Sequence, residues 1–359
     1  MSRTEEEVLA AIERRRRRGH VKLMDEHITL SHGAGGKSSH TLVETLFLDE
    51  LRNPLLEALG DSALLDPTGP AGPRLAFSTD GSVVKPLFFP GGDIGELAVN
   101  GTINDLAMAG ARPLALAAAF ILEEGLATGD LRRVVASMAA AAGRASVPVA
   151  TGDTKVVERG KADGLYIATT GVGIVEHDLA LGPDAVRPGD RVLVSGTIGD
   201  HGMAIMVARG ELELETDLTS DTAPLHELTA TLLAAAPGVR WLRDPTRGGV
   251  ATVLNELAMG AQVAIVVDER ALPIRPEVNG ACEILGIDPL YVANEGKLVA
   301  VVAPEDADAA LAALQAHPLG AHAAIVGEIG AEPPGMVMLE TSFGGSRVVV
   351  HHENFFHKR

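Results

Sequence analysis

"RLAFSTD" (residues 74–80) and "IGELAVNGTINDLAMAGA" (94–111) are the stretch of sequence that decides the fold. The first segment is a short apolar run that ends in an acid, which is typical of a strand. The second segment places Leu97, Ile103 and Leu106 at helical spacing, so that they share one broad face. A strand followed by a helix with such a face predicts a sheet that is covered by helices.

The same mixture of strands and helices continues along the chain. Strands are expected at 113–122, 147–154 and 164–175, and a helix is expected at 129–145. A polar stretch with two prolines, 177–190, then breaks the pattern and predicts a domain boundary. Strands and helices resume at 191–206, 225–236, 248–261, 262–268, 296–304, 305–317 and 323–330. We therefore expect an α/β (α+β) protein with two domains, each a mixed sheet covered by helices.

Four parts of the chain follow from these boundaries. Residues 1–27 are expected to form a solvated or disordered extension, 28–180 an N-terminal domain, 181–345 a C-terminal α/β domain and 346–359 a tail. The extension contains five arginines, Arg14 to Arg18, and no apolar segment follows them. A secretory or twin-arginine signal is therefore not expected, and a cytoplasmic location is the default.

Composition excludes several classes of protein. The 359 residues carry 30 Lys+Arg against 48 Asp+Glu, a net charge of −18, which argues against a general nucleic-acid binder. No apolar run approaches the roughly 18 residues that a membrane span needs. A single cysteine, Cys282, excludes an internal disulfide framework and a cysteine-rich zinc site, and its setting predicts a small core residue.

Four aspartates occupy apolar or small-residue surroundings, three of them at the ends or starts of expected elements. They are Asp80, Asp105, Asp153 and Asp244. A carboxylate in such a place is costly unless it is paired, hydrogen-bonded or bound to a cation. Several of them together suit Mg²⁺, which takes oxygen ligands and often bridges to phosphate. The alternative for each one is a cap on the next helix or turn.

A glycine-rich loop, "SHGAGGKSSH" (31–40), resembles a phosphate-binding loop but fails the strict pattern. Gly36, Lys37 and Ser38 fit its second half, whereas Ser31 stands where the first glycine is required. The small residues of the loop can still bring several backbone N–H groups close to an anion. A flexible loop before a helix is the other interpretation.

Three further side chains are candidates for the chemistry. Arg247 lies in "DPTRGG" at an expected helix start, where it can fork onto a phosphate, or else remain solvated. Lys155 follows Asp153 closely and could orient a phosphate or move a proton; an ordinary surface lysine is the alternative. Glu295, in "ANEGKL", could act as a general base or be a turn acid.

Taken together, these motifs closely resemble the HypE family of hydrogenase maturation proteins, from about residue 28 to 330. The segments that carry the resemblance are "HGAGGK", "LAFSTDGSVVKPLFFPGG", "ATGDTKVVERG", "LVSGTIGDHGMAI", "RDPTRGGV" and "ANEGKLV". This family belongs with aminoimidazole ribonucleotide synthetase, selenophosphate synthetase and thiamine-phosphate kinase. The resemblance implies a homodimer of two-domain subunits, with ATP beside the dimer interface and the glycine-rich loop as its lid.

The resemblance also implies a reaction and a set of site residues. The reaction is ATP-dependent dehydration of an S-carboxamide to a thiocyanate, which supplies the cyanide ligands of [NiFe]-hydrogenase iron. Implied partners are the carbamoyltransferase HypF and the HypC–HypD scaffold complex, with no nucleic acid and no membrane. Asp80, Asp105, Asp153 and Asp244 are implied to bind Mg²⁺, and Lys155 and Glu295 to handle protons. ATP and phosphate contacts are implied for Gly33, Gly35, Gly36, Lys37, Asp80, Asn104, Thr151, Gly152 and Arg247.

One departure from the family concerns the tail. The family's tail ends in Pro-Arg-Ile-Cys and carries the carbamoyl group on its cysteine, whereas this sequence continues "GGSRVVVHHENFFHKR" without a cysteine after Cys282. The alternatives are therefore a phosphotransferase or ligase of the same fold that acts on another acceptor, and a non-catalytic partner that binds ATP. The histidines of the tail, His351, His352 and His357, could bind a metal, although a disordered tail is the plainer expectation.

Overall fold

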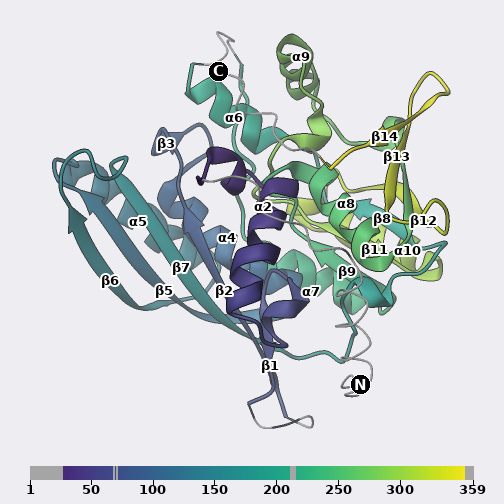
Figure 1. Cartoon of the computed structure of the whole chain (residues 1–359), viewed down its shortest axis with the longest axis horizontal. Helices are drawn as coiled ribbons and strands as arrows, with labels where there is room; N and C mark the ends of the chain where they lie inside the picture. The colour runs from purple at the N-terminus through teal and green to yellow at the C-terminus, as the bar shows by residue number, and fades with distance from the viewer. Residues whose placement is uncertain (1–26, 68, 70–71, 211–215, 352–359) are drawn as a thin grey trace.

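The computed structural model describes residues 27–67, 69, 72–210 and 216–351. Figure 1 shows two large sheets side by side, each with helices packed on it. The Arg14–Arg18 run, His352 and His357 lie outside the described residues. Within the described ranges, no helix combines the length and the apolar character needed to cross a membrane.

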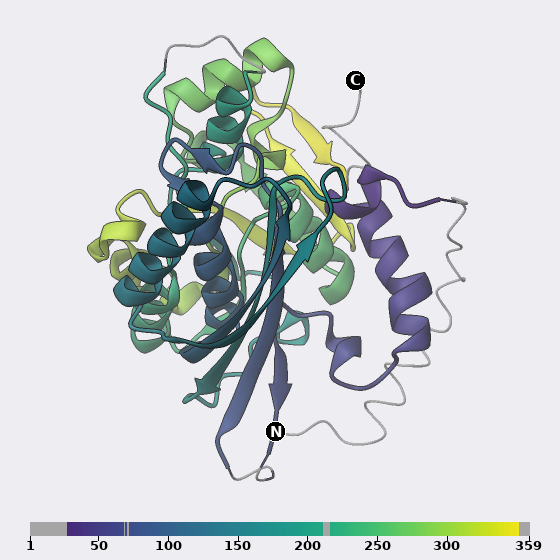
Figure 2. The ribbon, with the colours of Figure 1, turned by 90° about the vertical axis from the view of Figure 1, so that its left-hand side faces the viewer.

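The first sheet is a mixed sheet of five strands in the order β1-β2-β7-β5-β6. Its strands are β1 (Ala63–Leu65), β2 (Arg74–Ser82), β5 (Ala111–Glu123), β6 (Val149–Val157) and β7 (Leu165–Val175). Strands β5 and β6 run parallel, and the other neighbours are antiparallel. Helices α4 (Ile94–Met108) and α5 (Thr128–Arg144) lie on one side of this sheet (Figure 2).

Helix α4 is buried on almost every side. Asp93 caps its start, since its carboxylate accepts hydrogen bonds from the N–H groups of Gly95 and Glu96 at 2.7 and 3.1 Å. A Cβ on Gly171 of β7 would lie 2.8 Å from the side chain of Thr102, so this glycine lets the helix approach the sheet closely. Even the polar Asn104 is 1% exposed. The helix therefore holds Asp105, which follows Asn104, in a rigid setting.

The second sheet has seven strands in the order β14-β13-β10-β12-β8-β11-β9. Its strands are β8 (Arg191–Val194), β9 (Val239–Arg243), β10 (Ala264–Asp268), β11 (Val299–Val302), β12 (Ala324–Gly330), β13 (Met336–Glu340) and β14 (Ser346–Val349). The longer helices of this half are α6 (Asp200–Ala208), α7 (His226–Ala235), α8 (Gly249–Ala261), α9 (Pro276–Leu285) and α10 (Ala307–Ala316). Helix α8 packs on one face, and α7 with α10 packs on the other.

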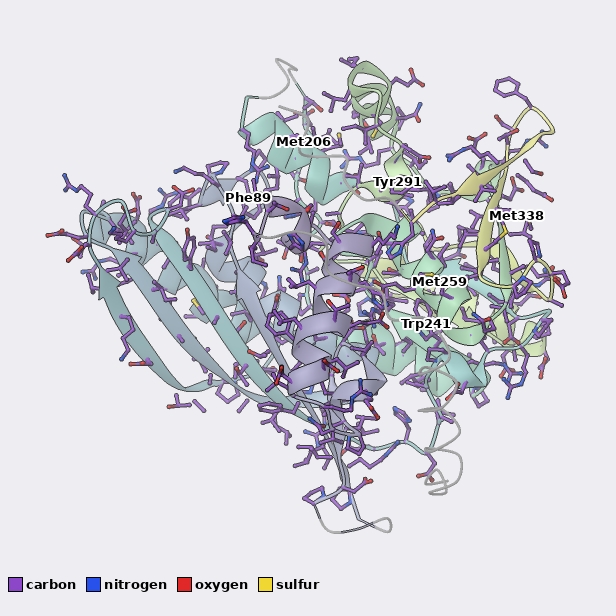
Figure 3. The ribbon with its side chains drawn as sticks, in the orientation of Figure 1. Phe89, Met206, Trp241, Met259, Tyr291 and Met338 are labelled. Carbon is purple, nitrogen blue, oxygen red and sulfur yellow. The ribbon has the colours of Figure 1, made fainter. Side chains whose placement is uncertain are left out.

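This three-layer arrangement explains the uninterrupted apolar runs of the second half. Val192 and Val194 of β8 belong to the core beneath α8, whereas Leu193 faces α7 and α10. A strand that is buried on both faces needs apolar residues at every position. Trp241 and Tyr291, labelled in Figure 3, are large members of the core on the α8 side.

The tail begins later than the sequence predicts. Residues from 346 onward were expected to lie outside the second domain, but Ser346–Val349 form β14, which pairs with β13 at the sheet edge. Val349 is 1% exposed and belongs to the core. Burial of this β-branched side chain accounts for the additional strand.

The two halves are joined by apolar packing. Ala107 and Met108 at the end of α4 share a core with Leu228 and Leu232 of α7. Phe89 of β3 (Phe88–Phe89), which pairs with β4 (Gly92–Asp93), contacts His201 edge-on at 5.7 Å between ring centroids. The N-terminal helical segment lies across the first sheet from α4 and α5 (Figure 2). It consists of the short helix η1 (Leu30–Gly33), α2 (Lys37–Leu42), the π-helical turn η2 (Val43–Phe47) and α3 (Leu48–Glu50).

Candidate functional site

Three aspartates from distant parts of the sequence converge beside helix α4. Asp105 lies on α4, Asp244 directly follows β9, and Asp61 precedes β1. Each offers a carboxylate oxygen, and these oxygens all lie within 4.8 Å of one another. We call Asp61, Asp105 and Asp244 the acidic cluster.

The acidic cluster is electrostatically unfavourable without a cation. Burial raises the pKa of Asp105 well above its usual range, and the negative charges of Asp244 and Asp61 raise it further. Burial also raises the pKa of Asp244, followed by the charge of Asp61. One buried and two half-buried carboxylates that resist ionisation together form the kind of oxygen-rich site that Mg²⁺ occupies. The donor set therefore fits the expected magnesium ion.

Two neighbours hold the carboxylates in place. Arg243 Nε lies 3.0 Å from Oδ1 of Asp61, which makes it the nearest compensating charge. The hydroxyl of Ser78 lies 2.6 Å from Oδ2 of Asp105 and 2.8 Å from the carbonyl oxygen of Asp61. These contacts orient two members of the cluster before any ion binds.

Asp80 and Glu295 lie around the acidic cluster. The charge of Asp80 contributes to the raised pKa of Asp105. A Cβ on Gly101 of α4 would lie 2.9 Å from Oδ2 of Asp80, so this glycine makes room for the carboxylate against the helix. Burial raises the pKa of Glu295 well above its ordinary value, and the charges of Asp244, Asp80 and Asp221 act in the same direction. Glu295 is therefore suited to accept a proton.

The glycine-rich loop docks on the turn that carries Asp244 and Arg247. Gly35 has φ +76°, and a Cβ on it would lie 2.9 Å from the carbonyl oxygen of Arg247. Gly36 has φ 79° and precedes the first residue of α2, Lys37. A Cβ on Gly33 would meet nothing within 4 Å. The structure thus brings Gly35 and Arg247 together, although they are far apart in the sequence.

Four predicted site residues lie away from the acidic cluster within one chain. Thr151, Gly152, Asp153 and Lys155 are all on β6, the edge strand three places from β2. At the usual spacing of neighbouring strands this is roughly 14 Å across the sheet. Asp153 and Lys155 are 63% and 71% exposed and form an ion pair at 3.0 Å.

The side chain of Asp153 also lies on the opposite face of the sheet from that of Asp80, contrary to the expectation that the two converge. Asp153 pairs with Ala119, Ala119 with Ala168, and Ala168 with Gly81. Because paired residues point to the same face, Asp153 shares a face with Gly81, whereas Asp80 points to the face that α4 covers. The prediction that Asp153 and Lys155 join Asp80 and Asp105 is therefore not met inside a single chain.

Two residues of the site differ from the sequence-based assignment. Asp61 is not among the predicted metal ligands, because a single acid before a short strand carries no local pattern that indicates a metal site. Asn104 was expected to contact ATP, but its amide contacts the backbone of Ala223, Leu225 and Glu295 at 2.8–3.1 Å.

Cys282 is a core residue, as expected. Its side chain is 1% exposed on α9. Burial raises the pKa of its thiol to about 11, so the thiol stays protonated near neutral pH and is a poor nucleophile.

Two family models match the chain over most of its length. The N-terminal domain of AIR synthase related proteins matches residues 59–175, and the C-terminal domain of the same family matches residues 187–339. The first range contains the first sheet, and the second contains most of the other sheet. The fold expected from the sequence is thereby confirmed.

Similar proteins and solved structures show to which branch of the AIR synthase related proteins the chain belongs. The carbamoyl dehydratase HypE of Cupriavidus necator is 55% identical over 92% of this chain and 93% of its own length. A structure of a HypE–HypF complex matches with a TM-score of 0.82 and 47% identity, covering 87% of this chain and 99% of that one. A structure of HypE in complex with ATP matches with a TM-score of 0.76 and 48% identity, covering 91% and 98%. The chain therefore belongs to the HypE family, the carbamoyl dehydratases of hydrogenase maturation.

Proposed function

We propose that this protein uses Mg·ATP to dehydrate a cysteine-bound carboxamide to a thiocyanate. The observation that carries the proposal is the acidic cluster, which lies next to both the docked glycine-rich loop and Glu295. The named relatives support it, since one of them is a complex of HypE with ATP.

In the proposed site each group has a separate role. Asp61, Asp105 and Asp244, with Asp80 beside them, would hold Mg²⁺, which when bound offsets the charge of the phosphates. Gly33, Gly35, Gly36 and Lys37 would cover the phosphates, and Arg247 would fork onto one of them. Positive groups and backbone N–H donors aimed at the transferred phosphoryl group stabilise the charge that develops on it.

The proposed reaction needs a base as well as an activated oxygen. The carboxamide oxygen takes the terminal phosphoryl group and becomes a good leaving group. The C–O bond then breaks, phosphate departs, and the nitrogen loses both protons as the C≡N bond forms. Glu295 takes one proton from this nitrogen, the departing phosphate takes the other, and the raised pKa of Glu295 matches its task.

We propose further that the protein works as a homodimer through the face of the first sheet opposite α4 and α5, with residues 28–180 as the nucleotide-binding and dimerisation domain and 181–345 as the second domain. Phe77 and Ile121 on that face are 46% and 39% exposed. Asp153 and Lys155 point from the same face, so a second copy would bring these two residues to the interface. HypF and the HypC–HypD complex are the proposed further partners, and the HypE–HypF structure supports the first of them.

A second candidate function follows from the state of Cys282. It is the one cysteine of the sequence, and its buried thiol is not a suitable carbamoyl acceptor. A phosphotransferase or ligase that acts on a different acceptor would use the same acidic cluster and lid without this thiol.

The test supplies the acceptor separately. A synthetic peptide ending in Pro-Arg-Ile and an S-carbamoylated cysteine is incubated with the protein and Mg·ATP, and the peptide is followed by mass spectrometry. Loss of one water from the peptide, with one ADP formed per event, supports the dehydratase. ATP turnover without a change in the peptide favours the second candidate, and nucleotide binding without turnover indicates a non-catalytic partner. A parallel reaction with HypF, ATP and carbamoyl phosphate tests whether this chain itself gains a carbamoyl group.

A further inference from the structure

The peptide group of Glu295 is held on both sides by buried side chains from other elements. Its N–H donates to Oδ1 of Asp221 at 3.0 Å. Its carbonyl oxygen accepts from Nδ2 of Asn104, also at 3.0 Å. Asn104 is 1% exposed and the side chain of Asp221 is 4% exposed, so neither bond competes with bulk water.

Asp221 is itself fixed by a buried ion pair. Its Oδ2 accepts from Lys297 Nζ at 3.0 Å, and the same ammonium lies 3.3 Å from the carbonyl oxygen of Gly296. A Cβ on Gly296 would lie 1.8 Å from the backbone oxygen of Asp221, so the loops that carry these residues meet at backbone contact. The loop of Asp221 therefore cannot move without moving the segment that holds Glu295.

Asn104 ties the same loop to helix α4. Its Nδ2 also donates to the carbonyl oxygen of Ala223 at 3.1 Å, and its Oδ1 accepts from the N–H of Leu225 at 2.8 Å. The next residue of the helix is Asp105, a member of the acidic cluster. One turn of α4 thus sets the position of both the cluster and Glu295.

We propose that Asn104 and Asp221 are positioning residues that clamp Glu295 at a fixed place beside the acidic cluster. This inference rests on the proposed function, because it gives Glu295 a task that depends on its position. Asn104 acts through Glu295 and touches no substrate, since both ends of its amide are bonded to the protein. A base that is displaced by about 1 Å loses on the order of 100-fold in rate.

The chain offers a matched control for Asn104. Asn100 lies one turn earlier on α4, is fully buried, and donates to Oγ1 of Thr222 at 3.1 Å in the same loop. Asn100→Asp and Asn104→Asp are thus the same isosteric change, on the same helix and towards the same loop. Only the second breaks a bond to Glu295.

The experiment compares these variants in the S-carbamoyl peptide assay. We expect Asn104→Asp to lower kcat by about 10- to 100-fold, with ATP affinity by calorimetry within about twofold of that of Asn100→Asp. We expect Asn100→Asp, whose carboxylate can accept from the Thr222 hydroxyl, to lower the melting temperature less and to retain most of kcat. Equal kcat values for the two variants would overturn the clamp.

A double-mutant cycle separates positioning from general damage. If Asn104 acts through Glu295, the variant Asn104→Asp/Glu295→Gln has the same kcat as Glu295→Gln alone. If the fold-losses in kcat of the two single variants multiplied in the double variant, the proposal would be contradicted. Should Asn104→Asp not fold, Asp221→Asn takes its place in the same cycle, with the same two outcomes. A Glu295→Gln variant with unchanged kcat would instead show that the proposed function is wrong.

Discussion

The acidic cluster and the Asp153–Lys155 pair of β6 look alike in the sequence, but they differ in exposure, in the direction of their pKa shifts and in the charge of their neighbours. The aspartates of both lie among small or apolar residues, within or next to strands and helices. Burial raises the pKa of Asp105, whereas the hydrogen bond from Lys155 lowers the pKa of the exposed Asp153. The comparison teaches that an acid in an element becomes a candidate metal ligand only where other elements bring it beside further acids and reduce its exposure.

The largest expected effect is a loss of Mg·ATP affinity, which should depend on protein concentration at β6 but not at the acidic cluster. Asp105→Asn should weaken Mg·ATP binding by about 100-fold or more, because it removes a ligand from the cluster. The loss should be the same at every protein concentration, since the cluster belongs to one chain. Asp153→Asn should weaken binding only where dimers form. Calorimetry with Mg·ATP across a range of protein concentrations measures the affinity of both variants. Equal losses of affinity in the two variants at all concentrations would contradict the different roles of the acidic cluster and β6.

Mixing inactive variants tests whether β6 completes the site of a second copy. A mixed dimer of Asp105→Asn and Asp153→Asn chains contains one site with both aspartates intact. Random exchange in a two-fold dimer then restores about a quarter of the wild-type turnover. Turnover is measured after the two variants are unfolded and refolded together. If the mixture stays as inactive as either variant alone, Asp153 does not act across the interface.

The glycine-rich loop docks beside the acidic cluster, and we expect substitution of its Gly35 to weaken ATP binding. Gly35→Ala places a side chain at φ +76° and within 2.9 Å of the carbonyl oxygen of Arg247. The strain of about 1–2 kcal/mol predicts a roughly tenfold higher KM for ATP with little change in the melting temperature. Gly33→Ala, where a Cβ meets nothing within 4 Å, should have a smaller effect on KM. The account of lid docking would be wrong if the two substitutions raised KM equally.

The dependence of stability on pH should also distinguish the regions. Asp244 has a pKa raised from 3.8 to about 7, mainly by burial, so its protonated form stabilises the metal-free fold. That contribution is fully present below about pH 4 and is lost as the pH rises through 7, on the order of 1 kcal/mol per pH unit.

Metal-free Asp244→Asn should therefore be more stable than the wild type at pH 8, and the difference should shrink towards pH 4. Urea unfolding in the presence of a chelator measures it. A difference that does not change with pH would contradict the electrostatic account of the cluster.

The smallest effect is expected at β6. Asp153 and Lys155 form an exposed pair, and exposed pairs contribute little to the free energy of unfolding. Lys155→Met should change the free energy of unfolding of the free chain by less than about 0.5 kcal/mol. A loss of several kcal/mol in urea unfolding would mean that the pair stabilises the chain in a way that its exposure does not suggest.

Much of the fold could be predicted because local patterns carry it. The strand at 74–80, the helix at 94–111 and the alternation beyond them appear as β2, α4 and their neighbours. The short strands β9 and β14 were missed, since VRWLR and SRVV are too brief to show a period. Their place depends on partners that are distant in the sequence, which no local pattern reveals.

The site could be predicted only in part, for the same reason. The structure brings Asp105 and Asp244 into one cluster and places Gly35 against Arg247, whereas their roles in binding stay predictions. Asp61 was missed because a single acid before a short strand carries no signal until the fold brings it beside Asp105. The faces of Asp80 and Asp153 depend on strand register, and a register cannot be read from one strand alone.

The most direct test of the central claim is to locate the metal. A crystal of the protein with Mn²⁺ in place of Mg²⁺ and a non-hydrolysable ATP analogue gives an anomalous signal at the ion. We predict a peak within about 2.5 Å of carboxylate oxygens of the acidic cluster, Asp61 and Asp105 among them. A peak that contacts none of Asp61, Asp105 and Asp244, or bound nucleotide far from the cluster, would contradict the account.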